Sequence, residues 1–394
     1  MKQPTLPTIQ YIDSFAWGTA HEMFNASILW MCTQIPCSQV ICRATKSNIH
    51  SMERLLESAH LDTHKVITRP IPTVGGRGRL PLLIRYLLGT IQLWWHLVFS
   101  VRTQDIVLLP FNNLFALKGI NFLSKLLSRR VLIFCHGELE FVVSQVNKQG
   151  LLSRILSHRC LRFFTNPRTH ISHSLFFSVL GNHIRHNLKN ILPPSFSGHL
   201  FSMAHPYLFF KSSEHARHPH KKLSIGTCGT MTLSKGALVM AQFAAKCRDR
   251  HLDIDIYHVG SVLSGLDEML QAGIHIPSAE RALSREAYDE KVNQLDYLLF
   301  FYDPNSYQIT ASGAVMDAIA LQKPIIALRN DYFQYLFDTF GPFGILDNSV
   351  DAMVEHISQI CEGRLLISCD FRHIQEQLSP QSLLPEFEQI LQAI

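Results

Sequence analysis

The sequence predicts an α/β protein built from two parallel β-sheets, each covered by helices. Its 394 residues, 47% hydrophobic and 17% charged, suffice for two ordinary domains and exclude a disordered chain. In each half, short apolar runs alternate with stretches of helical periodicity, which is typical of β-α-β units. A polar, histidine-rich linker, 209–222, separates the halves. The predicted domains are therefore 1–208 and 223–379, followed by a last helix over 380–394.

Strands are predicted where short apolar runs end at turn residues. In the first half these runs are Thr8–Ile12, Gln39–Arg43, Lys65–Arg69, Asp105–Leu109, Arg130–Cys135, Leu161–Thr165 and His170–Ser172. In the second half they are Leu223–Cys228, Asp253–Val259, Ile274–Ile276, Asp296–Phe301, Pro324–Leu328 and Gly344–Leu346. Helices are expected from about Ala20, over Ser174–Leu180, from about Lys235 and over Ser312–Ala320.

Charge and cysteine content restrict the class of protein. The 36 Lys and Arg residues exceed the 31 Asp and Glu residues by only five, which excludes a dedicated nucleic-acid binder but suits anionic ligands or an anionic membrane surface. The nine cysteines are scattered and form no C-x-x-C pair, so we expect no disulfide framework or zinc site. The N-terminus has no apolar core of a secretory signal. These features predict a protein of the reducing cytoplasm.

The most membrane-like stretch is Leu82–Val101, which has the length of a membrane span. It carries Arg85, Gln92 and His96, and a charge deep in a bilayer is costly. The pattern therefore predicts an amphipathic helix. The helix either packs inside a domain or lies on the inner leaflet, and a true span is the least favoured interpretation.

The linker contains His215, His218 and His220, a cluster that raises the possibility of a metal site. No acidic partner accompanies the three histidines, and a metal site needs supporting second ligands. The cluster is therefore interpreted as part of a solvated linker, and no metal is expected in the protein.

Ligands of doubly wound sheets bind beyond the carboxyl ends of the strands, so the turns that follow strands are informative. After the first strand, Gly18 and Thr19 would let the backbone approach a ligand at a helix start. The alternative is an ordinary turn that Thr19 caps. The turn lacks the G-x-G-x-x-G pattern, so a nicotinamide or flavin cofactor is not expected.

A second informative turn is His136-Gly137-Glu138, which directly follows an apolar strand. Burying such groups without partners costs several kcal/mol, so they are expected to face a cleft. Either His136 or Glu138 would then serve as an acid or base, or bind a ligand hydroxyl. Alternatively, Glu138 only caps a helix start and His136 is internally satisfied.

In the second half, a glycine-rich strand end is followed by Ser234-Lys235-Gly236. Gly229 and Thr230 would let the backbone approach a phosphate, and Lys235 would add a positive charge. The order and spacing do not match a Walker A loop.

The segment Tyr302–Leu328 reads as a loop, a helix start and a helix that leads into another strand. Ser312 and Gly313 at the helix start would offer free backbone amides to an anion. Asp317 would accept hydroxyl groups of a ribose. The alternative is that Ser312 is only an N-cap and Asp317 only a charge in the first turns of the helix.

Together these segments resemble the GT-B glycosyltransferases, in particular the family 4-like enzymes that build bacterial exopolysaccharides and cell-surface glycans. The resemblance covers about 220–350 and rests on Ser234-Lys235-Gly236, Val259-Gly260 and the stretch from Asp317 to Pro324, which is similar to the family's E-A-x-A-x-G-K-P. The first half matches in its organisation and in its His136-Gly137 turn.

The resemblance implies two Rossmann-like domains facing a cleft, with the acceptor on the first domain and a nucleotide-sugar on the second. Lys235, with the amides of Ser312 and Gly313, would hold the diphosphate, and Asp317 would hold the ribose. His136 would lie where sugar and acceptor meet. Neither a metal nor another cofactor is usual in the family, and its last helix crosses back to the first domain. The implied activity is a hexosyl transfer from a nucleotide-sugar to a glycan or lipid-linked glycan, at the inner membrane face or in the cytoplasm.

The sequence departs from the family pattern at three places. The family's paired glutamates correspond to Ile309 and Asp317, and Gln322 replaces a glycine. An arginine common after the first strand of the second domain is missing. The sugar contact normally made by the first glutamate is left to Tyr302, Asp303 or Ser306. Two other functions therefore stay open: a non-catalytic partner of an active transferase, and a nucleotide-sugar epimerase.

Overall fold

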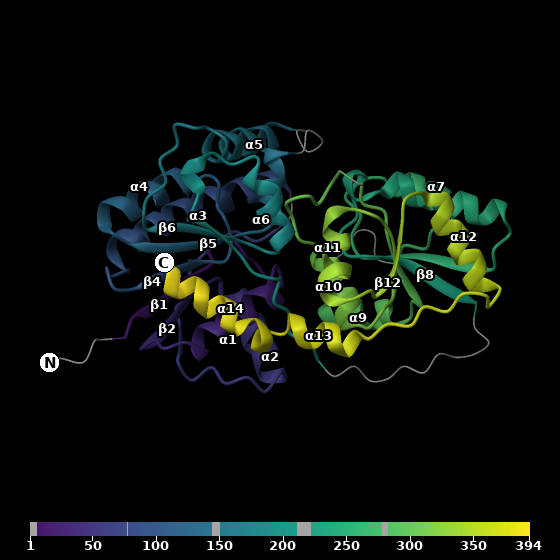
Figure 1. Ribbon diagram of the computed structural model, residues 1–394, viewed down its shortest axis with the longest axis horizontal. Helices are drawn as coiled ribbons and strands as arrows, with labels where there is room; N and C mark the ends of the chain where they lie inside the picture. Colours follow the sequence, from purple (N-terminus) through teal and green to yellow (C-terminus); the bar gives the residue numbers. More distant parts are fainter. Residues whose placement is uncertain (1–5, 77, 144–149, 211–221, 278–282, 304) are drawn as a thin grey trace. The chain divides into compact units, whose positions relative to one another are not determined.

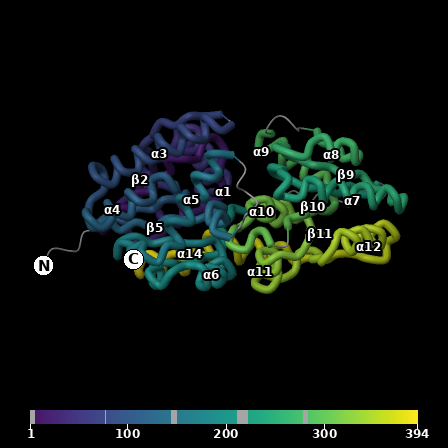
Figure 2. The backbone as a smooth tube through the Cα atoms, turned by 90° about the horizontal axis from the view of Figure 1, so that it is seen from above, coloured from purple at the N-terminus to yellow at the C-terminus, as the bar shows by residue number. Residues whose placement is uncertain are grey.

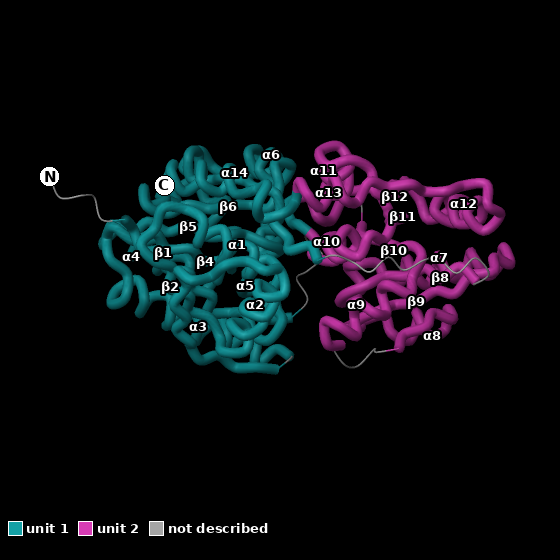
Figure 3. Tube along the Cα trace, turned by 90° about the horizontal axis from the view of Figure 1, so that it is seen from below, with its two compact units in different colours: residues 1–210, 309–311, 378–394 teal, residues 211–308, 312–377 magenta. Residues whose placement is uncertain are grey.

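The computed structural model describes residues 6–76, 78–143, 150–210, 222–277, 283–303 and 305–394. The chain divides into two compact units (Figure 3). Unit 1 contains Met1–Phe210, Ile309–Ala311 and Leu378–Ile394, and unit 2 contains the remainder. The first division, after Phe210, falls within the stretch expected to be a linker. The histidines of that linker, His215, His218 and His220, lie outside the described residues.

Unit 1 is built on a seven-stranded parallel sheet (Figure 1). The strands are β1 (Thr8–Ile12), β2 (Gln39–Arg43), β3 (Val66–Thr68), β4 (Ile106–Leu109), β5 (Arg130–Cys135), β6 (Leu175–Val179) and β7 (Leu200–Ser202). They lie in the order β3-β2-β1-β4-β5-β6-β7. The chain thus moves outward from β1 in one direction and then returns to continue on the other side. The strand order reverses between β1 and β4.

Helices cover both faces of this sheet (Figure 1). They are α1 (Glu22–Gln34), α2 (Lys46–Ser58), α3 (Arg79–Phe99), α4 (Leu117–Leu127), α5 (Leu151–Phe164), α6 (Asn182–Lys189) and α14 (Pro380–Ala393), with short 3-10 turns at Glu138–Val142 and Pro194–Phe196. Residues of α3, α4, α5 and α6 share one apolar cluster with one face of the sheet. On the other face, α14 packs against α1, so the last helix belongs to unit 1.

Three predicted elements of unit 1 are wrong. Leu161–Thr165 is the end of helix α5 instead of a strand, and His170–Ser172 has no regular structure. The predicted helix Ser174–Leu180 is strand β6, whose five residues are all buried. A short apolar run covered on both faces has no alternation by which to distinguish a strand from a buried helix, and this is the source of the error.

Unit 2 is built on a five-stranded parallel sheet. Its strands are β8 (Leu223–Cys228), β9 (Ile254–Val259), β10 (Tyr297–Phe300), β11 (Ile325–Leu328) and β12 (Gly344–Asp347), in the order β12-β11-β10-β8-β9. The order reverses between β8 and β10. The predicted strand Ile274–Ile276 is reduced to a single bridge between Tyr257 and His275.

The helices of unit 2 are α7 (Ala237–Asp249), α8 (Leu266–Gln271), α9 (Arg285–Asn293), α10 (Gly313–Ala320), α11 (Asp331–Phe340), α12 (Val350–Cys361) and α13 (Phe371–Leu378), with a 3-10 turn at Leu233–Lys235. Helix α8 packs beside α7 (Figure 2). The two parallel sheets with their helices confirm the predicted α/β class.

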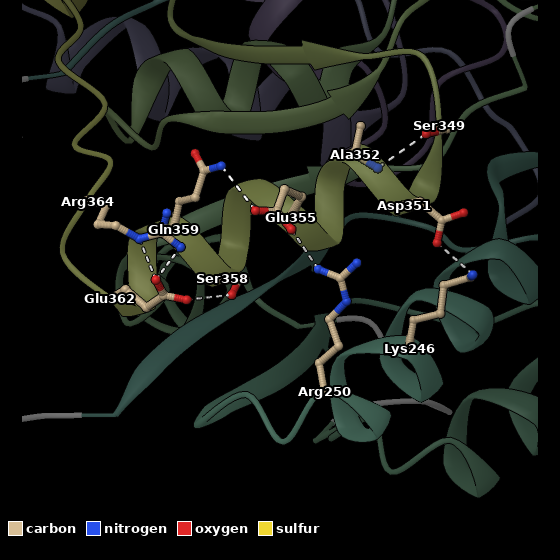
Figure 4. A network of polar contacts seen from close by, with 10 residues as sticks. All are labelled: Lys246, Arg250, Ser349, Asp351, Ala352, Glu355, Ser358, Gln359, Glu362 and Arg364. Atoms are coloured by element: carbon tan, nitrogen blue, oxygen red, sulfur yellow. Dashed lines mark hydrogen bonds and ion pairs between the residues drawn. The ribbon is translucent and has the colours of Figure 1, made fainter.

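Two ion pairs join α7 to α12 (Figure 4). The Lys246 ammonium lies 2.6 Å from Asp351, and the Arg250 guanidinium lies 2.8 Å from Glu355. Both pairs are solvent-exposed, so their contribution to stability is small. The position of α7 therefore depends mainly on its buried residues, such as Phe243, in the apolar core of unit 2.

Candidate functional site

The predicted donor-side residues gather where the strand order of unit 2 reverses. Gly229, Thr230 and Lys235 follow β8, and the segment from Tyr302 to Asp317 follows β10. Strands β8 and β10 are neighbours in the sheet, and the chain leaves them in opposite directions. Such a switch point opens a crevice at the carboxyl ends of the strands, where α/β proteins bind ligands. The topology therefore brings together two segments that lie about 70 residues apart in the sequence.

The backbone at this point is packed so closely that it needs glycine. Gly260, after β9, has a φ of +142°, and a Cβ atom placed there would lie 1.8 Å from the carbonyl oxygen of Gly229. The N–H of Gly229 donates to the carbonyl of Val259 at 2.9 Å. A Cβ atom on Gly229 would touch that of Ala314 at 3.6 Å. The turns after β8 and β9 and the start of α10 thus form one continuous backbone surface.

The start of helix α10 is free of side-chain caps. Ser312 occupies the N-cap position but makes no capping hydrogen bond, so its interpretation as a simple N-cap is wrong. Its hydroxyl lies 3.1 Å from that of Tyr302 instead. Gly313, the first helical residue, is exposed. Within the described part of the chain, the first amides of α10 therefore remain available to an anion, which the helix dipole also attracts.

The Tyr302 side chain packs inside this segment and is not accessible to a ligand. Its side chain is buried, with its ring stacked against Tyr307 at 4.2 Å and near Phe333 at 5.6 Å. Ser306 has a similarly local role, because its hydroxyl donates to the carbonyl of Asp303 at 2.7 Å. Neither Tyr302 nor Ser306 is therefore placed as a replacement for the sugar-binding glutamate of the family.

Lys235 is the cation of this site. It ends the 3-10 turn after β8, which Thr232 caps by accepting a hydrogen bond from the Lys235 N–H. The side chain is half-buried, and burial lowers the pKa of its ammonium group. No carboxylate among the described residues forms an ion pair with it. An ammonium group in this position is poorly solvated and unpaired, so a bound anion would satisfy it.

The thiol of Cys228, at the end of β8, shows which charges gather here. Burial raises its pKa to about 12, and the negative charge of Asp317 acts in the same direction. The positive charges of Lys235 and Arg285 oppose this shift. All three charged groups therefore lie close to the carboxyl end of β8.

Asp317, the predicted ribose ligand, is already engaged within unit 2. Its carboxylate accepts hydrogen bonds from the Arg285 guanidinium at 2.9 Å and from the Tyr288 hydroxyl at 3.0 Å. Arg285 also contacts Asp289 at 3.0 Å. Arg285 and Tyr288 were not predicted as site residues, because the α9 segment is charged and carries no motif. Only the packing of α9 beside the switch point reveals their contact with Asp317.

The predicted acceptor-side loop follows β1 and lies at the switch point of unit 1. Gly18 has a φ of +61°; its N–H donates to the Ser47 hydroxyl at 3.1 Å and its carbonyl accepts from Asn48 at 2.9 Å. Thr19 is exposed and does not cap the helix, which begins at Glu22, two residues later than expected. The loop is therefore held by α2 and leaves its tip open to solvent.

His136 follows β5 and presents an unprotonated nitrogen. Its Nε2–H donates to the carbonyl of Pro110 at 2.9 Å. Burial, together with the charges of His21 and His205, lowers its pKa well below the ordinary value, so the ring is neutral and Nδ1 carries a lone pair. No described residue binds that nitrogen. The rings of His21 and Phe24 flank the His136 ring, and their centroids lie 4.7 and 4.6 Å from its centroid.

Glu138 binds the backbone at the end of β5. Its side chain is buried, and its carboxylate accepts a hydrogen bond from the backbone N–H of His136 at 3.0 Å. His136 precedes the 3-10 turn, which begins at Glu138, so this contact does not cap a helix start, and a catalytic role for Glu138 stays a prediction. Burial raises its pKa to about 7.

This pKa has a consequence for stability. Between pH 4.5, where the carboxyl group ordinarily titrates, and about 7, the folded chain keeps a proton that the unfolded chain loses. The free energy of unfolding should therefore fall by up to about 3 kcal/mol as the pH rises through this window. Glu138→Gln should remove that fall, as measured by urea unfolding at several pH values. The exposed Glu53→Gln is the control; equal pH slopes in both variants would contradict the assignment.

The described side chains were also compared with the needs of a metal site, for which several ligands must converge. Among the side chains that the structure describes, no group of three or more His, Cys, Asp or Glu residues is placed to hold a metal ion. The expectation of a reaction without a metal or cofactor stays a prediction.

Several solved structures are similar to this chain over nearly its whole length. TarM has a TM-score of 0.63 at 10% identity, with 98% of each chain covered. The lipopolysaccharide outer core galactosyltransferase WaaB has a TM-score of 0.58 at 12% identity, covering 98% of this chain and all of its own. HepE from Anabaena, in complex with UDP-glucose, has a TM-score of 0.62 at 10% identity, covering 99% of this chain and all of its own.

No protein-family model matches the sequence, and no curated protein matches it. At identities of 9–12%, the similarity to solved structures concerns the fold. It extends over nearly the whole chain and includes the Rickettsia africae glycosyltransferase, at a TM-score of 0.55. The predicted fold is therefore confirmed: this chain has the GT-B fold.

Proposed function

We propose that this protein is a glycosyltransferase that moves a sugar from a nucleotide-diphosphate donor to a glycan or lipid-linked glycan. One observation carries the proposal: the half-buried ammonium group of Lys235, which pairs with no carboxylate of the described residues, and the uncapped start of α10 lie at the switch point of unit 2. The GT-B fold supports it, because HepE holds UDP-glucose and the catalytic domain of Arabidopsis starch synthase IV holds ADP and acarbose.

The proposed chemistry is electrostatic. When the sugar leaves the donor, negative charge develops on the diphosphate. Lys235 would stabilise this charge with its ammonium group, and the amides from Gly313 onward would do so with their N–H groups and the helix dipole. Because the protein itself supplies these positive groups, the reaction is proposed to need no metal or other cofactor, and activity should persist in the presence of EDTA.

Asp317 remains the proposed ribose ligand despite its internal contacts. A carboxylate has about four acceptor positions, so it can hold Arg285 and Tyr288 and still accept a ribose hydroxyl. The internal contacts would orient it before the donor arrives. We also propose that Arg285 replaces the arginine that the family carries after the first strand of its second domain, because its charge already acts on Cys228.

Unit 1 is proposed to bind the acceptor. The exposed Thr19 and the backbone of Gly18 line the end of β1, and the Nδ1 lone pair of His136 can accept a hydrogen bond or proton from a hydroxyl group. The acceptor is proposed to be a growing cell-surface polysaccharide or its lipid-linked precursor. The protein would accordingly work in the cytoplasm, in part at the inner face of the membrane.

A thermal-shift screen tests the donor proposal. UDP-glucose, UDP-N-acetylglucosamine, GDP-mannose and ADP-glucose are the probes, because a ligand bound only by the folded chain raises its melting temperature. At least one should stabilise the protein, and the matching nucleoside diphosphate should do so more than the monophosphate, which lacks the second phosphate. If no nucleotide-sugar or diphosphate changes the melting temperature, the proposal is wrong.

A non-catalytic partner subunit is the second candidate, and Ile309 favours it. The family has a sugar-binding glutamate at this position, whereas Ile309 is fully buried and belongs to the apolar cluster of unit 1. No carboxylate can act from there. Hydrolysis of the donor separates the two candidates: a transferase releases the nucleoside diphosphate slowly without an acceptor, and a non-catalytic subunit binds the donor without turnover.

A further inference from the structure

We propose that an apolar face of α3 and α4 docks onto a membrane surface that contains anionic lipids. This face, named here the α3–α4 face, consists of Leu87, Ile91, Trp95 and Phe99 on α3 and of Phe122 and Leu126 on α4. Each of the six side chains is between 46% and 67% exposed. The two helices pack side by side, so these exposed residues lie on neighbouring elements of unit 1.

The spacing on α3 shows that this face is continuous. Leu87, Ile91, Trp95 and Phe99 follow one another at intervals of four residues, which places them along one line of the helix. The opposite side of the helix is also apolar: Tyr86, Leu93 and Leu97 are buried in the core of unit 1. Helix α3 thus has one apolar face for the core and a second one that faces solvent. A large exposed apolar patch marks a site of interaction.

Next to the face, Trp94 is anchored by contacts with α4. The indole N–H of the neighbouring Trp94 donates to the carbonyl of Ala116 at 3.0 Å, and its ring lies against Gly119, where a Cβ atom would be 2.3 Å away. This contact of Trp94, which is not part of the face, fixes α3 on α4. The rings of Trp95 and Phe99 contact each other at 4.3 Å and are exposed. Exposed tryptophan is favoured where apolar and aqueous surroundings meet.

The charge around this face identifies the partner. Residues 63–210 contain 17 Lys and Arg residues but only three acidic ones, Asp105, Glu138 and Glu140, and all three are buried. The described surface of this segment therefore displays no exposed carboxylate. Lys118 and Lys125 are exposed on α4 beside Phe122, and Arg102 is exposed just after α3. An apolar face on a segment whose exposed charges are all cationic is complementary to an anionic lipid surface.

Helix α3 itself is long and apolar enough to cross a membrane, with 21 residues and a mean hydropathy of 1.3 over its most apolar stretch. Its contacts argue against a span. Leu93 and Leu97 lie in the core of unit 1, and a membrane span would pull both of these buried leucines out of that core. The helix therefore lies in the membrane interface while it stays part of unit 1. This inference does not depend on the proposed transferase reaction.

Sedimentation with vesicles tests the inference on the full chain. One set of vesicles is phosphatidylcholine alone, and the other contains phosphatidylcholine and phosphatidylglycerol. The protein should bind the anionic vesicles, at least about tenfold more weakly in high salt, and release from them at alkaline pH as a peripheral protein does. Retention at alkaline pH would show a span, and no binding to either vesicle would exclude a lipid partner.

Paired variants locate the surface. Trp95→Glu with Phe99→Glu should abolish binding, and Lys118→Glu with Lys125→Glu should lower it at least about tenfold. Leu366→Glu, at an equally exposed leucine of unit 2, is the control and should bind normally. Each variant should keep the melting temperature and nucleotide response of the parent chain, which separates this test from that of the donor site. If the aromatic variant still binds anionic vesicles, the α3–α4 face is not a lipid surface. The same conclusion follows if its only effect is to convert a dimer of the chain into monomers.

Discussion

Lys235→Ala should lower kcat/KM for the nucleotide-sugar about a hundredfold, equivalent to about 3 kcal/mol of transition-state stabilisation. The reason is that Lys235 is the cation at the β8 end of the switch point that has no carboxylate partner among the described residues. Its charge is therefore not neutralised before the diphosphate arrives. Most of the loss should appear in kcat, because the charge on the diphosphate develops during the reaction. Steady-state kinetics with the donor found in the thermal-shift screen provides the measurement.

Arg250→Ala is the matched control for this variant. It also removes one positive charge from unit 2, but that charge is paired with Glu355 on the exposed contact between α7 and α12. Its kinetics should equal those of the parent chain, and its melting temperature should change little. A Lys235→Ala enzyme with unchanged kcat would place the diphosphate elsewhere and would remove the main support for the proposed donor site.

Gly260→Ala should destabilise unit 2 by roughly 3 kcal/mol or more and should abolish binding of the donor. The added methyl group would lie 1.8 Å from the carbonyl oxygen of Gly229, a backbone atom that cannot move without opening the turn after β8. Relief of this contact would also shift Gly229 relative to Ala314 and the start of α10. Thermal melting and the nucleotide response report the two effects separately.

Gly273→Ala separates backbone strain from the steric clash. Gly273 also has a positive φ, +82°, but a methyl group there would meet no atom within 4 Å. This variant should lose only about 1 kcal/mol and keep normal donor binding. Equal effects of the two substitutions would show that the contact between Gly260 and Gly229 does not shape the site.

The sequence predicted the strands well where their ends are marked. Thr8–Ile12, Gln39–Arg43, Arg130–Cys135 and Leu223–Cys228 have the predicted bounds, because each apolar run stops at a turn residue. It failed at α5 and β6, where apolar residues without periodicity are compatible with a buried helix or a buried strand. Tertiary packing decided between the two states.

Some residues of the candidate site could likewise be predicted from the sequence, and others could not. Gly229, Lys235 and Gly313 were found from the sequence because glycines and a lysine after strands are the groups that bind phosphate. Arg285 and His205 carry no local signal, since an arginine in a charged helix and a histidine in a loop are ordinary. Their roles arise from neighbours far away in the sequence: Asp317 for Arg285 and His136 for His205.

The sequence alone determined that this chain forms two parallel-sheet units, since these depend on local periodicity. From turn chemistry it also predicted an anion site after β8 and β10. Only the tertiary structure decided how these groups are used. It paired Ser312 with Tyr302 and Asp317 with Arg285, left Lys235 unpaired among the described residues, and placed Ile309 in the core of unit 1. The physical reason is that hydrogen bonding, burial and charge pairing depend on which side chains are neighbours in space. The order of the strands in the sheet determines which segments become neighbours.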